Sequence, residues 1–108
     1  MLDLPGGFVD HNEPLEHALS RELREELGLD IQHWQYFCSD SNPYIYRDVA
    51  YQTCVAIFKA VLIEKPKLRI DSSEIKQFKW VPKHLIDTTE IGFISLKNAI
   101  EKYLSQIN

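Results

Sequence analysis

Three glutamates stand close together in the stretch RELREELG, which runs from Arg21 to Gly28 and contains Glu22, Glu25 and Glu26. Leucines recur every four positions around them, which is typical of a helix with one buried side. At about 100° per residue, Glu22 and Glu26 fall along that apolar side, where a carboxylate without a partner is costly to bury. Neighbouring carboxylates also repel one another. This pattern indicates that the glutamates bind cations.

Two kinds of cation can neutralise these side chains. Arg21 can pair with one or two of them. A divalent metal would hold the rest, because Mg²⁺ and Mn²⁺ prefer carboxylate and carbonyl oxygens and often take substrate phosphate as well. Gly6 and Gly7 open the same segment, and such a pair can offer a carbonyl to a metal or N–H groups to an anion. The alternative is a solvated helix stabilised by Glu/Arg pairs three or four residues apart.

The composition describes an ordinary globular chain. It has 108 residues, 44% hydrophobic and 26% charged, which fits a single domain over 1–108. Residues 1–30 carry 8 acidic and 2 basic side chains, so the net charge of −4 comes from an acidic front end. Such an end repels nucleic acid backbones, so no stable nucleic acid binding is expected. The chain has no long apolar run and no signal peptide, which predicts a cytoplasmic protein without membrane association. Cys38 and Cys54 lack CxxC spacing, so reduced, mostly buried thiols are expected.

Two helices are predicted around these residues. The leucine repeat predicts a helix over 14–27, with Pro14 in its first turn and Gly28 as its stop. A second amphipathic helix is predicted over 95–106, with Ser95 as its N-cap.

Between the helices the pattern changes to short β-rich pieces. Segments with alternating β-branched and aromatic residues, or ending at a glycine-rich break, are predicted as strands: 2–4, 31–38, 51–63 and 75–81. A turn is expected over 39–44, and Pro82 is expected to open a short helical turn through Ile86. Together these elements predict one layered α+β domain.

The order of residues from Gly7 to Leu29 carries a more specific signal. Gly7 is followed by five residues and Glu13, then by seven residues and REL, one residue, EE, one residue, Gly28 and Leu29. This segment resembles the Nudix box, G-x5-E-x7-R-E-U-x-E-E-x-G-U with U aliphatic, at every fixed position. The surrounding sequences LPGGFVD and FKWVPKHLI are similar to the family too. The resemblance therefore covers essentially the whole chain.

The resemblance implies hydrolysis of a small nucleotide substrate, a nucleoside diphosphate linked to another moiety. ADP-ribose-like compounds, dinucleotides and nucleoside triphosphates are such substrates. The implied cofactor is Mg²⁺ or Mn²⁺, and its implied ligands are the Gly6 carbonyl and the catalytic carboxylates Glu22, Glu25 and Glu26. Arg21 and Glu13 would form the pair that fixes the helix and orients these glutamates.

The resemblance leaves the general base and the base-binding residues open. Glu22 and Glu74 are the two candidates for the base, and Glu74 is equally well explained as an exposed loop residue in DSSE. Gly6, Gly7 and Arg21 are expected to contact the diphosphate of the substrate. Several aromatic side chains could stack on its nucleobase or could instead be core residues and cross-strand pairs: Trp34, Tyr44, Tyr46, Tyr51 and Trp80. Of these, Tyr46 is predicted to bind substrate.

The family fold is an α/β/α sandwich in which a mixed sheet is flanked by the Nudix helix and a C-terminal helix. Family members normally carry strands ahead of the box, so the resemblance predicts an N-terminally truncated version of this fold. Their absence would leave an open strand edge, and a homodimer through that edge would cover it. The absence of these strands is also compatible with a non-catalytic module that binds a nucleotide or a protein, or with a domain that starts further upstream.

Overall fold

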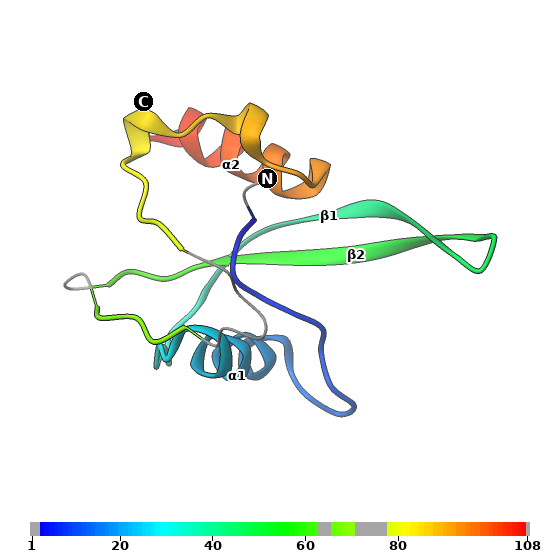
Figure 1. Ribbon diagram of the computed structural model, residues 1–108, viewed down its shortest axis with the longest axis horizontal. Coiled ribbons are helices and arrows are strands. Elements are labelled where there is room, and N and C mark those ends of the chain that lie inside the picture. Colours follow the sequence, from blue (N-terminus) through cyan, green and yellow to red (C-terminus); the bar gives the residue numbers. More distant parts are fainter. Residues whose placement is uncertain (1–2, 63–65, 71–77, 108) are drawn as a thin grey trace. The chain divides into compact units, whose positions relative to one another are not determined.

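The computed structural model of the protein describes residues 3–62, 66–70 and 78–107 (Figure 1). In chain order its elements are α1 (Leu15–Leu27), β1 (Gln35–Tyr46), β2 (Val49–Lys59), the 3-10 turns η1 (Lys83–Leu85) and η2 (Thr88–Glu90), and α2 (Ile94–Gln106). The two helices and the antiparallel hairpin confirm the predicted α+β class. The residues divide into the α1 unit, within 5–35 and 59–80, and the hairpin unit, within 1–4, 36–58 and 81–108.

Helix α1 forms where the leucine repeat predicts it. Pro14 is its N-cap in an extended conformation, one position before the predicted first turn, because the helix begins at Leu15. Gly28 ends the helix with a left-handed φ of 68°, and its N–H donates to the Arg24 carbonyl at 3.1 Å. A side chain at this φ is strained, so glycine is the favoured residue for the stop. The predicted end of the helix is therefore confirmed.

The core of the α1 unit packs around the C-terminal half of that helix. Leu23, Leu27 and Leu29 form the buried cluster, and partly buried apolar side chains pack against it: Leu19, Ile31, Trp34, Leu68 and Ile70. The Arg69 N–H donates to the Leu27 carbonyl at 2.7 Å, which ties the later segment to the helix end. Strand β1 starts at Gln35, four residues later than predicted, because Ile31 and Trp34 pack against this core instead of joining the strand.

The hairpin corrects one prediction about the chain's turns. Strand β1 continues through the segment 39–44 that was expected to turn. The chain reverses at Arg47 and Asp48, whose φ angles of 50° and 64° fit the two-residue turn that matches the twist of a hairpin. Pro43 has no backbone N–H. It is compatible with β1 because an outward-facing position on an edge strand has no neighbouring strand to which an N–H would donate. Strand β2 likewise begins at Val49, two residues before its predicted start, and ends earlier, at Lys59.

In the hairpin unit, α2 is attached to β1 through polar side chains. Ser95 is fully buried and its Oγ accepts a hydrogen bond from Asn42 Nδ2 at 2.7 Å, while the Ser95 N–H donates to Asn42 Oδ1 at 3.2 Å. The prediction of Ser95 as N-cap is therefore wrong, because Phe93 takes that position and the hydroxyl binds the strand. Asn98 donates to Asp40 at 3.1 Å, and this hydrogen bond lowers the pKa of Asp40.

Other predictions have mixed outcomes. Pro82 precedes η1 as expected. Residues 3–4 and 78–81 do not form strands, while the rest of those two predicted strands lies outside the described residues. The sheet formed by the described part of the chain is therefore the two-stranded β1–β2 hairpin and not the larger mixed sheet.

Cys54 is exposed and Cys38 partly buried, so the expectation of buried thiols is wrong for Cys54. Neither helix in the described ranges is long and apolar enough to cross a membrane.

Candidate active site

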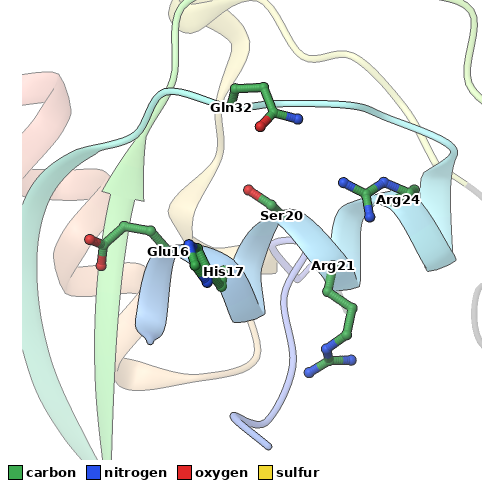
Figure 2. Close-up of a pocket in the computed structure, with 6 residues that line it drawn as sticks. All are labelled: Glu16, His17, Ser20, Arg21, Arg24 and Gln32. Atoms are coloured by element: carbon green, nitrogen blue, oxygen red, sulfur yellow. The ribbon is translucent and has the colours of Figure 1, made fainter. Parts of the chain in front are cut away.

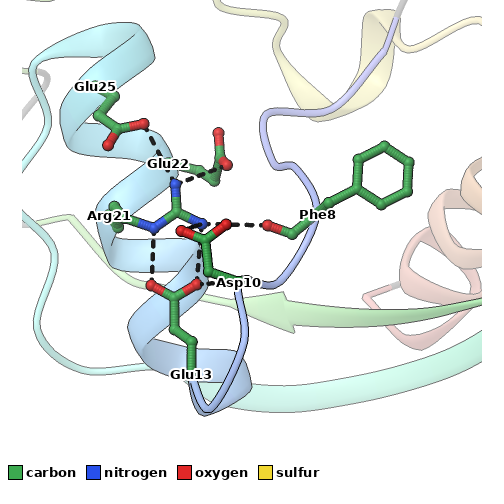
Figure 3. A network of polar contacts seen from close by, with 6 residues as sticks. All are labelled: Phe8, Asp10, Glu13, Arg21, Glu22 and Glu25. Atoms are coloured by element: carbon green, nitrogen blue, oxygen red, sulfur yellow. Dashed lines mark hydrogen bonds and ion pairs between the residues drawn. The ribbon is translucent and has the colours of Figure 1, made fainter.

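Arg21 connects helix α1 to the loop that precedes it. Its Nε donates to Glu13 Oε2 at 2.7 Å and its Nη2 donates to Glu13 Oε1 at 2.9 Å (Figure 3). Two parallel bonds between a guanidinium and a carboxylate fix both position and orientation. The Asp10 N–H also donates to Glu13 Oε1, at 3.0 Å. Glu13 therefore holds the loop backbone and the helix together.

These hydrogen bonds change the acid–base behaviour of the pair. The hydrogen bonds from Arg21, followed by that from the Asp10 N–H, lower the pKa of Glu13 from 4.5 to about 2. The same contact raises the pKa of Arg21. Hydrogen bonds to the ionised form of a carboxyl group favour that form. Glu13 thus stays ionised in the folded protein over a wider pH range than in the unfolded chain.

The pKa of Glu13 predicts a defined loss of stability in acid. Because the folded pKa lies below the unfolded one, the contribution of Glu13 is fully present above pH 4.5 and is lost as pH falls toward about 2. Urea unfolding of the wild type and of Glu13→Gln should therefore give free energies whose difference shrinks across this window. A difference that stays constant from pH 5 to the lower limit, about pH 2, would contradict the assignment. The comparison with the variant removes the parallel contributions of Asp40 and Asp87, whose pKa values are also lowered.

The same guanidinium reaches two of the three helix glutamates. Arg21 Nη1 donates to Glu22 Oε1 at 3.0 Å and to Glu25 Oε2 at 3.3 Å. Its Nη2 donates to the Phe8 carbonyl at 3.2 Å and lies 3.4 Å from Asp10 Oδ2 (Figure 3). One cation is thus surrounded by several acceptors, from the loop on one side and from the helix on the other. This arrangement orients Glu22 and Glu25 relative to the loop.

Gly7 brings the loop backbone against Glu22. A Cβ atom at Gly7 would lie 2.7 Å from both carboxylate oxygens of Glu22, which is closer than real Cβ contacts allow. The Glu22 side chain is 16% exposed and occupies the space that any larger residue would fill. The reason for a glycine at position 7 is therefore steric: it makes room for a carboxylate.

Replacing Gly7 by alanine is expected to displace the Glu22 carboxylate and to leave the fold intact. The displaced group is the flexible end of a side chain, so the fold can adapt by moving it. We expect Mg²⁺ affinity and turnover to fall about tenfold or more, as for other changes that misplace a metal ligand. The Mg²⁺ dependence of the melting temperature reports the affinity. Gly7→Ala with wild-type Mg²⁺ affinity and turnover would show that Glu22 does not need this space.

The donor set suits a hard divalent cation. Glu22, Glu25 and Glu26 follow one another on α1. The side chain of Glu22 is 16% exposed and that of Glu25 is 59% exposed, while Glu26 is partly buried. Gly6 contributes a loop carbonyl nearby in the sequence, and the space at Gly7 accepts a carboxylate. Oxygen ligands of this kind fit Mg²⁺ or Mn²⁺. In the described ranges, however, no three acidic, histidine or cysteine side chains converge as they would around an ion.

The other predicted site residues have separate locations. Glu74 lies outside the described residues. Tyr46 belongs to the hairpin unit, as do Tyr44 and Tyr51. Trp34 packs against the α1 core and its Nε1 donates to Ser20 Oγ at 2.9 Å, so its environment fits a core residue rather than a stacking one. The sequence did not predict that the Phe8 carbonyl would bind Arg21, because side-chain patterns carry no signal for backbone acceptors.

A polar hollow of about 290 Å³ lies on another side of α1 (Figure 2). It is lined by Glu16, His17, Ser20, Arg21, Arg24 and Gln32. In Figure 2 the Ser20 side chain points toward Gln32, whereas the guanidinium of Arg21 points away from them. Ser20 Oγ itself donates to the Ile31 carbonyl at 2.7 Å. This hollow is therefore distinct from the carboxylate network that surrounds the Arg21 guanidinium.

Comparisons with known proteins show the family of the chain. The family model of the NUDIX domain matches residues 1–101, so the chain belongs to the Nudix family. It is 36% identical over 80 residues to an 8-oxo-dGTP diphosphatase of Buchnera aphidicola subsp. Schizaphis graminum, an alignment that covers 73% of this chain and 54% of that protein.

Two further relatives are NAD-capped RNA hydrolases named NudC. The one from Vibrio vulnificus is 30% identical over 80 residues, covering 74% of this chain and 28% of the relative. The one from Vibrio atlanticus is 27% identical over 108 residues, covering 99% and 37%. The aligned part of this chain thus spans between about a quarter and about a half of the length of these relatives.

Proposed function

We propose that this chain is a metal-dependent pyrophosphohydrolase that cleaves the diphosphate linkage of a nucleoside diphosphate joined to another moiety. The observation that carries the proposal is the Arg21 network. It joins the loop at Phe8 and Glu13 to the helix carboxylates Glu22 and Glu25 with hydrogen bonds of 2.7–3.3 Å. A solvated helix stabilised by Glu/Arg pairs would not require bonds from the same arginine to a preceding loop.

In this proposal the acidic residues of α1 and the loop backbone bind the metal together. Glu22, Glu25, Glu26 and the Gly6 carbonyl would hold Mg²⁺ or Mn²⁺. The ion, when bound, supplies positive charge that offsets the diphosphate and polarises the phosphorus under attack. Arg21 and Glu13 position the glutamates, so that their geometry is set before substrate binds.

The protein must also accept a proton from the attacking water. Glu22 and Glu74 are the candidates, and a carboxylate oxygen of one of them would take the proton as the water oxygen bonds to phosphorus. The bond from phosphorus to the bridging oxygen then breaks, and that oxygen leaves with the second phosphate. Glu22 is held by Arg21 at 3.0 Å, which fixes the position of its carboxylate beside the loop.

The proposal is tested by measuring product release from a panel of nucleotides with Mg²⁺, with Mn²⁺ and with chelator. The panel should include 8-oxo-dGTP, NAD and NAD-capped RNA, because relatives are named for acting on such compounds, together with ADP-ribose and a dinucleoside polyphosphate. We expect cleavage of at least one compound that stops when the metal is removed.

A second function, a non-catalytic module that binds a nucleotide, is favoured by the lack of converging metal ligands among the described residues. It predicts binding of panel compounds without cleavage under any metal condition. Cleavage that continues in chelator would contradict the metal-dependent proposal, while binding alone would support the module.

A further inference from the structure

Each N–H group of the Arg21 side chain has an acceptor in the network of Figure 3. A guanidinium carries five N–H donors. Nε and one N–H of Nη2 bind Glu13, and the second N–H of Nη2 binds the Phe8 carbonyl. The two N–H groups of Nη1 bind Glu22 and Glu25. Arg21 can therefore take a new partner, such as a phosphate oxygen, only in exchange for one of these acceptors.

The five hydrogen bonds of Arg21 differ in length and in exposure to water. The two bonds to Glu13 measure 2.7 and 2.9 Å, the usual range for a charged donor and a charged acceptor, and the Glu13 side chain is 16% exposed. The bond to Glu25 Oε2 is the longest of the five, at 3.3 Å, and the Glu25 side chain is 59% exposed. Exposed ion pairs four residues apart on a helix contribute little, because water competes with them. The bond to Glu25 is therefore the one that Arg21 gives up most readily.

The other two helix glutamates have less freedom to move than Glu25. Glu22 is 16% exposed, and its carboxylate lies in the space beside Gly7. Glu26 is partly buried. In the part of the chain that the structure describes, these side chains do not converge as ligands around one ion would. Convergence therefore requires a side chain to move, and Glu25 is the one with space to do so.

We propose that Glu25 exchanges its hydrogen bond with Arg21 for a divalent cation, while the two bonds between Arg21 and Glu13 stay in place. This inference rests on the metal site of the proposed function and adds a competition within it. Arg21 favours metal binding by orienting Glu22, and it opposes metal binding by holding Glu25. The N–H of Nη1 that Glu25 leaves becomes available to a phosphate oxygen. Arg21 thus contacts the diphosphate of a substrate only after the cation has bound.

The alternative is that Glu25 binds Arg21 and the cation at the same time. Its Oε2 would then stay on Arg21, and only its Oε1 would face the cation. This arrangement keeps the Glu25 carboxylate where Arg21 holds it, although the described glutamates do not converge in that position. The exchange allows the side chain to turn toward the cation. The two arrangements differ in one observable, which is whether the N–H of Nη1 keeps its acceptor when metal binds.

Nuclear magnetic resonance of ¹⁵N-labelled arginine side chains tests the exchange on the 108-residue chain, with Mg²⁺ as the only ligand. The signals of Arg21 are assigned as those that disappear in Arg21→Lys. On addition of Mg²⁺, the Nη1 hydrogen bound to Glu25 should shift and should exchange faster with water. The Nε signal, which reports the bonds to Glu13, should keep its position. The rise of the melting temperature with Mg²⁺ concentration shows when the site is saturated.

Two alanine variants of exposed glutamates on α1 provide the comparison. Glu25→Ala should show the altered Nη1 signal before Mg²⁺ is added, and Mg²⁺ should change that signal little further. The variant is expected to fold, because the side chain is exposed and alanine favours a helix. Glu16→Ala removes a glutamate from the first turn of the same helix, and its Arg21 signals should respond to Mg²⁺ as those of the wild type do.

Failure of the exchange and failure of the metal site give different results. An Nη1 signal that stays in place after Mg²⁺ has saturated the melting temperature would overturn the exchange and leave the metal site standing. A shift of the Nε signal as large as that of Nη1 would also overturn it, because the bonds to Glu13 would then open too. A melting temperature that does not respond to Mg²⁺ would remove the metal site of the proposed function, and the exchange with it.

Discussion

Replacing Glu26 by glutamine is expected to reduce metal-dependent turnover by about 10²–10⁴-fold. Glutamine has nearly the same shape but carries no charge, so it removes an anionic ligand without removing packing atoms. Glu26 lies partly buried in α1, between the buried residues Leu23 and Leu27 in the sequence. Its carboxylate is therefore placed on the side of the helix where a charge is expected to have a cation as partner. Initial rates with saturating Mg²⁺ measure the effect.

The control for this change is Glu16→Gln on the same helix. Glu16 is exposed in the first turn of α1 and lies beside the hollow of Figure 2, away from the Arg21 guanidinium. The turnover of Glu16→Gln and the response of this variant to Mg²⁺ should match those of the wild type. Unchanged turnover in Glu26→Gln would remove this carboxylate from the metal site. Equal losses in both variants would show a general effect of charge on the helix rather than a specific ligand.

Replacing Arg21 by lysine is expected to lower Mg²⁺ affinity and turnover by about 10–100-fold, although the charge is kept. Lysine cannot form the two parallel bonds to Glu13 and at the same time reach Glu22, Glu25 and the Phe8 carbonyl, because its donors sit on a single nitrogen. The loop would then be held less firmly against α1. Mg²⁺ titrations of the melting temperature and rate measurements at saturating metal separate lost affinity from lost orientation.

Arg24→Lys provides the matched comparison. Arg24 is exposed on the same helix, and its ion pair with Asp30, at 3.6 Å, is of the surface kind that contributes little. We expect the Mg²⁺ affinity and the turnover of Arg24→Lys to stay at the wild-type level. If Arg21→Lys behaved like Arg24→Lys, positive charge alone would suffice at position 21, and the fork geometry would not be part of the site.

Local sequence signals predicted the elements whose causes are local. The leucine repeat located α1, because the period of a helix places those leucines on one side, and Gly28 marked its end, because only a left-handed residue closes that turn easily. Pro82 marked the start of η1 because its ring fixes φ near the value that a helical turn needs. The spacing from Gly7 to Leu29 identified the family, which the match over residues 1–101 shows.

Predictions failed where distant segments compete for the same residues. The polar stretch 39–44 has the composition of a turn, yet it forms strand because Asn42 and Asp40 bind side chains of α2 more than 50 residues away in the chain. Ser95 has the chemistry of an N-cap, but its hydroxyl and N–H both bind Asn42. A polar residue can satisfy its hydrogen bonds locally or across the fold, and composition does not distinguish these outcomes.

The sequence by itself determined the chemistry of the candidate site and the order of its residues. The three glutamates, Arg21 and the glycine pair lie within 21 positions, and a helical period brings the glutamates onto neighbouring turns. Only the tertiary structure decided how the loop returns to the helix: the Phe8 carbonyl on Arg21 and the space that Gly7 leaves for Glu22. These contacts depend on the path of an irregular loop, whose backbone conformation no repeat in the sequence specifies.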